Sequence, residues 1–156
     1  MWTRKSLLSV SSASVNVLRV TADTNVFISG LNFRGNPRRV LEMAEEGQIH
    51  LAVSDDILEE IDRVLRREKF GWPDAEILRA LTQISRFTEH VEPKQRIDVI
   101  TEDPTDNRIL ECAAASGSEY LVTGDKHLLM LGQYQQVNIV TPADLIEIQA
   151  QQGRGR

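Results

Sequence analysis

The chain alternates short apolar segments with longer segments whose apolar residues recur at helical spacing. Strands are predicted at residues 17–21, 49–53, 120–123 and 137–140, with a short extended piece at 90–92. Helices of about 10–15 residues between strands imply crossover connections, and crossovers join parallel strands. The sequence therefore predicts an α/β fold, a three-layer α/β/α sandwich around a parallel sheet with right-handed crossovers.

Helix start and stop signals set the expected boundaries of the helices. The predicted helices begin at Asn36, Asp55, Asp74, Asp103 and Pro142, the second ending near residue 68 and the last near 149. Asn36 and Ser54 are expected to be capping residues, and Gly117 ends the Ala-rich helix. Before Asn36, residues 26–31 predict a short apolar turn, with a loop from Gly30 to Gly35.

Length and composition favour one folded domain. The chain has 156 residues, and domains average roughly 150. Hydrophobic residues make up 41% and charged residues 26% of the chain, which argues against disorder. Residues 1–16 are Ser-rich and less apolar than a secretory signal, so a flexible extension is expected there. The domain is expected at residues 17–150, with a frayed C-terminus at 151–156.

Net charge and cysteine usage exclude several classes of protein. A net charge of −5 argues against holding nucleic acid by bulk charge, so any phosphate chemistry needs local basic residues or bound cations. The single cysteine, Cys112, excludes an internal disulfide and fits a reducing, cytoplasmic compartment. With no evident histidine partner, it is expected in the core rather than as a nucleophile. No apolar run approaches the roughly 18 residues that span a bilayer, so no membrane partner is expected.

Carboxylates follow the predicted strands. Asp23 comes directly after the first strand, and Asp125 follows the strand at 120–123. Asp103 and Asp106 open the helix that precedes the strand at 120–123. Turn and capping chemistry explains each one singly, and Asp103-Pro104 especially matches a helix N-terminus. In parallel sheets, however, the ligand site lies beyond the carboxyl ends of the strands. Carboxylates at one such edge favour a shared site.

A further carboxylate comes from the helix after Ser54. Its apolar stripe consists of Ile57, Leu58, Ile61, Val64 and Leu65. Glu60 and Asp62 border the two sides of this stripe, and Glu59 points to solvent. Glu60 lies under about 10 Å along the helix from the sheet edge, and its side chain leans back toward that edge. Periodicity alone does not choose between Glu60 and Asp62.

Clustered carboxylates repel one another, and a divalent cation removes that repulsion. All-oxygen ligands favour one or two Mg²⁺ or Mn²⁺ ions over Zn²⁺. His50 and His90 are interpreted as structural residues and His127 as a plain loop residue that could touch substrate. Such a centre could clamp and polarise a phosphate and supply a nucleophilic water, which describes phosphodiester hydrolysis.

Basic residues near the first loop could hold the substrate. Arg34 lies at the end of that loop and Arg38 follows it, and Phe33 could stack on a base. The arginines of the second helix are interpreted mainly as solvated surface charge. RNA contacts are therefore assigned only to Arg34 and Arg38.

The order and spacing of these motifs resemble those of PIN-domain proteins, of the kind that act as toxins in prokaryotic toxin–antitoxin modules. The matching pieces are Asp23-Thr24-Asn25-Val26-Phe27, the helix of residues 54–70, Asp103-Pro104-Thr105-Asp106-Asn107 and Tyr120-Leu121-Val122-Thr123-Gly124-Asp125-Lys126. Together they extend over about residues 18–146.

The resemblance implies a PIN-like α/β/α nuclease domain, and a Mg²⁺- or Mn²⁺-dependent ribonuclease that cuts single-stranded RNA. Its catalytic and metal-binding acids carry over onto Asp23, Glu60, Asp106 and Asp125, with Asp103 as an additional acid and with Asn25 and Thr123 as supporting polar residues. It therefore favours Glu60 over Asp62. It also implies a homodimer and a cognate antitoxin that covers the acidic groove. The N-terminal extension is atypical, and His127 stands where an acidic or small polar residue is expected.

Three alternatives remain at the level of the sequence. The first is a catalytically silent PIN fold that binds RNA or another protein. The second is a receiver domain, which needs adjacent acids at the first strand, whereas Ala22 precedes Asp23. The third is a haloacid-dehalogenase-like phosphatase, whose Asp-x-Asp motif is broken here by Asn25.

Overall fold

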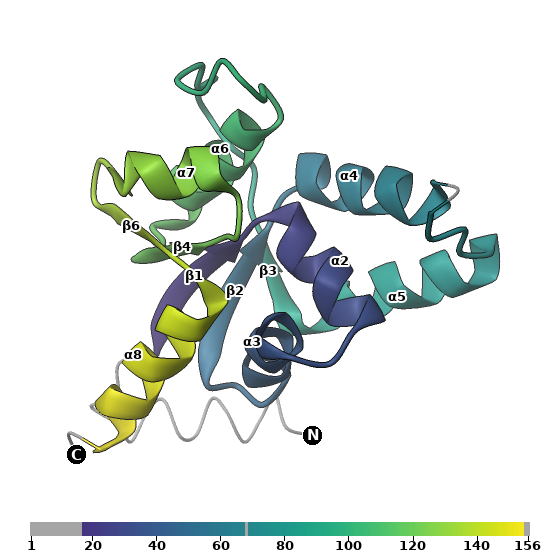
Figure 1. Ribbon diagram of the computed structural model, residues 1–156, viewed down its shortest axis with the longest axis horizontal. Coiled ribbons are helices and arrows are strands. Elements are labelled where there is room, and N and C mark those ends of the chain that lie inside the picture. Colours follow the sequence, from purple (N-terminus) through teal and green to yellow (C-terminus); the bar gives the residue numbers. More distant parts are fainter. Residues whose placement is uncertain (1–16, 68, 155–156) are drawn as a thin grey trace.

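The computed structural model describes residues 17–67 and 69–154, so the extension expected at residues 1–16 lies outside the described residues. Its centre is a six-stranded sheet in the order β3-β2-β1-β4-β6-β5 (Figure 1). The strands are β1 (Leu18–Ala22), β2 (Ile49–Val53), β3 (Thr88–His90), β4 (Tyr120–Val122), β5 (Gln133–Tyr134) and β6 (Val137–Val140). Neighbouring strands are parallel except β5, which pairs antiparallel with β6. The predicted α/β class is confirmed, and the edge strand β5 is an addition to the expected sheet.

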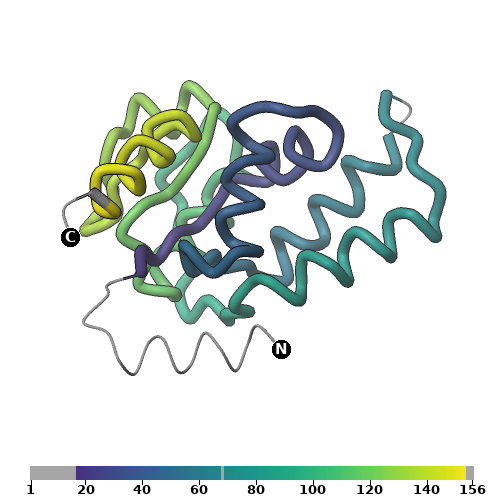
Figure 2. Tube along the Cα trace, turned by 90° about the horizontal axis from the view of Figure 1, so that it is seen from below, coloured from purple at the N-terminus to yellow at the C-terminus, as the bar shows by residue number. Residues whose placement is uncertain are grey.

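Helices cover both faces of this sheet. They are α2 (Thr24–Asn32), α3 (Asn36–Glu45), α4 (Asp55–Arg66), α5 (Asp74–Phe87), α6 (Asp106–Ser116), α7 (Lys126–Leu131) and α8 (Pro142–Arg154). The hydroxyl of Thr21 in β1 contacts Cys112 of α6. Successive strand residues point to opposite faces of a sheet. Val20 therefore faces the side of the sheet opposite α6, where α3 and α8 contact each other. Buried aliphatic side chains fill both interfaces, and α4 and α5 lie side by side in both views (Figures 1 and 2).

Helix α2 corrects the short apolar turn and loop that were expected after the first strand. Its β-branched residues and its glycine lower intrinsic helix propensity, but Asp23 caps it and Phe27 is fully buried. A Cβ atom at Gly30 would lie 2.6 Å from Leu41 Cδ1, so glycine at this position allows α3 to approach α2 closely. Tertiary packing thus decides the conformation of Thr24–Asn32 against its local preference.

The N-termini of two further helices show where capping was and was not predicted correctly. Ser54 caps α4 as expected, because its hydroxyl accepts a hydrogen bond from the Ile57 N–H at 3.3 Å. Asn36 does not cap α3. The N-cap is Gly35, whose φ of 140° favours glycine, and Asn36 is the first helical residue.

Other boundaries move by a few residues. Helix α6 begins at Asp106 rather than Asp103, because Asp103 and the residues after it form a turn first. The extended piece expected at 90–92 is β3, which ends at His90. Helix α8 continues to Arg154, so much of the C-terminus expected to fray is helical.

The pairing of β1 with β4 positions the site. Their register aligns Ala22 with Val122, so the two strands end side by side at the same edge of the sheet. The N–H of Asp23 extends this ladder by donating to the Val122 carbonyl at 2.9 Å. Within the described ranges, no helix is long and apolar enough to cross a bilayer.

Candidate metal centre

Asp23 is held at the end of β1 by two hydrogen bonds. Its side chain is buried, with Oδ2 accepting from the Thr123 hydroxyl at 2.7 Å and Oδ1 accepting from the Asn25 N–H at 3.3 Å. Burial raises the pKa of Asp23, and the nearby charges of Asp125 and Asp103 raise it further against the two hydrogen bonds. The carboxylate is therefore fixed in place but poorly neutralised.

Asp106, at the start of α6, is the least satisfied acid of the site. Asp106 is only 4% exposed, and its Oδ2 atom has no hydrogen-bond partner among the described residues. Burial, followed by the charges of Asp125 and Asp23, raises its pKa to about 7. A buried oxygen without a partner is costly unless a proton or a cation joins it.

Thr123 joins the two strand ends that carry acids. It is fully buried at the end of β4, donates to Asp23 Oδ2, and accepts the Asp125 N–H at 2.9 Å. Asp125 in turn caps α7, because its Oδ1 accepts from the N–H groups of His127 at 2.7 Å and Leu128 at 3.3 Å. One hydroxyl thus sets the relative positions of Asp23 and Asp125.

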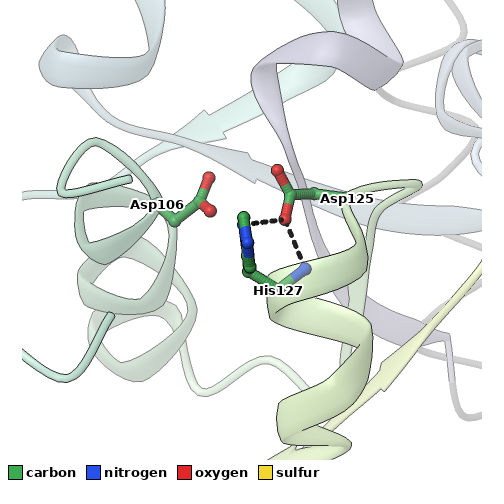
Figure 3. A group of neighbouring side chains, drawn as sticks. All are labelled: Asp106, Asp125 and His127. Atoms are coloured by element: carbon green, nitrogen blue, oxygen red, sulfur yellow. Dashed lines mark hydrogen bonds and ion pairs between the residues drawn. The ribbon is translucent and has the colours of Figure 1, made fainter. Parts of the chain in front are cut away.

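His127 lies in the first turn of α7, which corrects its interpretation as a loop residue. Its ring stands beside the carboxylates of Asp106 and Asp125 (Figure 3). One potential ligand atom from each of these three residues lies within 4.8 Å of the other two. The capping aspartate before the apolar run of residues 128–131 is the sequence signal that could have predicted α7.

Other acids meet in an adjoining cavity of about 240 Å³. Its lining includes Asp23, Asn25, Glu60, Arg67, Asp103, Thr105 and Asp106. Asp106 therefore belongs to both groups. Asp103 is oriented by Thr105, whose hydroxyl and N–H donate to Oδ1 at 2.7 and 3.2 Å.

Helix α4 directs Glu60 into this cavity and Asp62 elsewhere. Glu60 accepts from Arg63 at 2.5 Å, and Arg67 approaches its other oxygen at 3.9 Å. Asp62 instead pairs with Arg66 at 2.7 Å and does not line the cavity. The geometry favours Glu60 over Asp62, a choice that helical periodicity left open.

The predicted RNA contacts lie elsewhere. Arg38 donates to the carbonyls of Gly30 at 2.9 Å and Leu31 at 3.4 Å, so its guanidinium caps the end of α2. Arg34 is exposed and, like Arg38, does not line the acidic cavity. The arginine that does is Arg67, seven residues after Glu60 and therefore on the same helical face. That spacing is visible in the sequence.

The donor set fits a hard divalent cation. Several carboxylates surround one edge of the sheet, the Asp106 Oδ2 atom lacks a partner, and burial raises two of the pKa values. A cation would neutralise these charges and supply the missing partner. The chain offers no cysteine here, since Cys112 is buried under β1 and its pKa is raised to about 12 by burial. This edge of the sheet is therefore a candidate metal centre.

A family model described as PIN domain matches residues 19–127, which include every acid of the site. No curated protein matches the chain.

Proposed function

The chain belongs to the PIN-domain family, and because PIN domains are generally nucleases, we propose that it is a metal-dependent endoribonuclease that hydrolyses phosphodiester bonds in single-stranded RNA. The observation that carries the proposal is the buried, unpartnered Oδ2 of Asp106 beside Asp125, at the edge where Asp23 is also held. An isolated structural acid would find a hydrogen-bond donor at this depth.

In this proposal Asp23, Asp106 and Asp125 hold one or two Mg²⁺ or Mn²⁺ ions, with Glu60 and Asp103 completing the set from the adjoining cavity. When bound, the metal supplies positive charge at the scissile phosphate and lowers the pKa of a coordinated water.

The residues of the chain supply position and charge around that centre. Thr123 fixes Asp23 and the backbone of Asp125 through one hydroxyl. Asn25 lines the acidic cavity and fixes Asp23 through its N–H. Arg67 lines the same cavity and is only loosely paired with Glu60 at 3.9 Å, so it is placed to approach an RNA phosphate.

The biological role rests on the sequence resemblance. We propose that the protein is the toxin of a toxin–antitoxin pair, that it acts in the cytoplasm as a homodimer, and that a cognate antitoxin covers the acidic groove. The acidic net charge of −5 is consistent with an enzyme whose substrate contacts are local rather than spread over the surface.

A nuclease assay tests the function. The purified full chain should cut labelled single-stranded RNA in Mg²⁺ or Mn²⁺, and a chelator should stop the reaction. Asp23→Asn should lower the rate by about 100-fold or more, because the variant loses a carboxylate that would hold the metal, whose positive charge would stabilise the transition state, while circular dichroism shows an intact fold.

Asp62→Asn is the matched control, because Asp62 lies on the same helix as Glu60 but pairs with Arg66 outside the cavity. It should cut RNA at the wild-type rate. If Asp23→Asn cuts RNA as fast as wild type, the assignment of the site is wrong. Binding of RNA without cleavage in either metal would favour the silent PIN module instead.

A further inference from the structure

His127 contributes the one nitrogen donor in the group formed with Asp106 and Asp125. We propose that the His127 imidazole is a direct metal ligand, so that this centre prefers a first-row transition ion of the Mn²⁺ type over Mg²⁺. The inference rests on the proposed function only in assuming that the site binds a divalent cation.

Two observations identify this group as a ligand set rather than a cluster of surface acids. The three candidate ligand atoms lie within 4.8 Å of one another. Ligands on one ion are separated by at most about 4.2 Å, twice a bond of ~2.1 Å, so small side-chain rotations suffice. Independently, Asp106 is 4% exposed, its Oδ2 has no partner within the described part of the chain, and its carboxyl group lies on the side of α6 that faces Asp125 and His127 (Figure 3).

The local structure of α7 anchors the backbone of His127, while the nearest ring nitrogen makes only a long ion-pair contact with Asp125. The His127 N–H donates to Asp125 Oδ1 at 2.7 Å, which anchors the backbone. The ring Nδ1 lies 3.6 Å from the same oxygen, which is too long for a hydrogen bond. The side chain is 32% exposed, so it is half-buried against the site rather than projecting into solvent.

The chemistry of the donors gives the preference. Mg²⁺ selects oxygen ligands and keeps several waters, whereas transition ions accept imidazole nitrogen readily. Replacing one oxygen of an all-carboxylate centre by nitrogen therefore favours the transition ion. It also lowers the negative charge that the centre must hold when it is empty.

Electron paramagnetic resonance of Mn²⁺ bound to the full chain tests the proposal without relying on activity. The sequence contains 3 histidines, and both others are exposed. The double variant His50→Gln/His90→Gln therefore leaves His127 as the only imidazole. Spin-echo spectra of wild type and of this double variant should both show coupling of Mn²⁺ to a directly bound ¹⁴N nucleus.

The variant His127→Gln should lose the ¹⁴N coupling. Its affinity for Mn²⁺ should fall at least tenfold, by analogy with the ~10–100-fold losses that follow disruption of metal-site residues. Its affinity for Mg²⁺ should change less than about threefold. His90→Gln, which removes an imidazole paired with Asp55, should leave both affinities unchanged.

Each outcome decides a different point. Binding of Mn²⁺ without ¹⁴N coupling in wild type, or coupling that survives in His127→Gln, overturns the role of His127 but leaves the metal-dependent nuclease standing. Failure of wild type to bind Mn²⁺ while it binds Mg²⁺ overturns the role of His127 alone, and failure to bind either ion overturns both proposals. Equal losses of Mn²⁺ and Mg²⁺ affinity in His127→Gln would overturn the metal preference alone. If His127→Gln does not fold, the double variant still decides, because its site is unaltered.

Discussion

Thr123 is the residue through which the two acid-bearing strand ends are connected. Its hydroxyl donates to a buried carboxylate and accepts a backbone N–H, so both polar functions of the side chain are used. The hydrogen bond from the Thr123 hydroxyl lowers the pKa of Asp23, whereas burial raises it. A single hydroxyl thus affects both the geometry and the charge of the site.

Thr123→Val should therefore destabilise the protein. The variant preserves shape but removes a hydrogen bond to a charged group, which contributes about 1.5–3 kcal/mol. Urea unfolding should show a loss of that size in the free energy of unfolding, and Thr123→Ser, which keeps the hydroxyl, should lose less. Equal stabilities of the Val and Ser variants would show that the hydroxyl does not hold the site together.

Asp106 should make the metal-free protein less stable as pH rises. Burial raises its folded-state pKa from 3.8 to about 7, so between these values the folded state binds more protons than the unfolded state. The free energy of unfolding then falls as pH rises, and levels off above the folded-state pKa. Between pH 5 and 8 the wild type should lose about 3 kcal/mol more than Asp106→Asn.

Chemical denaturation of both proteins in chelator across that pH range measures this difference. Substitution by asparagine removes the titrating group, so the difference between the two curves reports Asp106 together with its coupling to Asp125 and Asp23. Parallel curves for the two proteins would mean that burial does not raise the pKa of Asp106 in the folded protein.

At the scale of single residues, the sequence predicted which acids meet but not how they are satisfied. Asp23 and Asp125 follow strands, and a parallel sheet brings such residues to one edge. The missing partner of Asp106 depends on burial, and the position of His127 depends on helix α7, which begins one residue before it. Neither is contained in spacing alone.

At the scale of elements, residues 91–105, the segment between β3 and α6, are held by hydrogen bonds to one buried amide side chain. Asn107 is fully buried, and its Oδ1 accepts from the N–H groups of Val99 and Ile100 at 2.9 and 2.8 Å. Its Nδ2 donates to the carbonyls of Ile100 and Pro104 at 2.8 and 3.1 Å. This segment, which contains no regular element, delivers Asp103 to the cavity.

Asn107→Leu should loosen that segment. The substitution conserves volume but leaves buried backbone groups unpaired, at a cost of about 1–3 kcal/mol for each unsatisfied group. Amide hydrogen exchange at Val99 and Ile100 should accelerate, and the free energy of unfolding should fall by at least 2 kcal/mol, as for other buried polar networks.

Asn138→Leu is the control, because Asn138 is an exposed residue of β6. It should unfold within about 0.5 kcal/mol of wild type. Unchanged exchange at Val99 and Ile100 in Asn107→Leu would mean that other contacts hold the segment.

Elements were predictable where local and tertiary signals agree. Ser54 and the apolar stripe behind it predicted α4, and Gly117 in a left-handed conformation ends α6 as expected. Helix α2 was missed because its residues favour a turn locally, and packing of Phe27 outweighs that preference. Strand β5 was missed because Gln133 and Tyr134 carry no apolar pattern.

At the scale of the whole molecule, the alternation of strands and helices suffices to give the class of fold, since few topologies bury such a pattern. It also determines that the acids gather where strands end. Repulsion among these carboxylates raises the free energy of the folded state alone, because the unfolded chain separates the charges. Cation binding and folding stability should therefore be coupled.

Saturating Mn²⁺ should raise the melting temperature, and more at pH 8 than at pH 6. A cation at 100 times its Kd stabilises the folded state by about 2.7 kcal/mol, which corresponds to roughly 5–10 °C for a chain of this size. At pH 6 the cation must displace the proton that the raised pKa of Asp106 retains, which weakens binding. Thermal unfolding with and without Mn²⁺ at both pH values measures the effect, and Asp106→Asn should show a smaller shift with little dependence on pH. A metal-induced shift that is equal at both pH values in wild type, or that survives in full in Asp106→Asn, would show that the cation binds away from the buried acids.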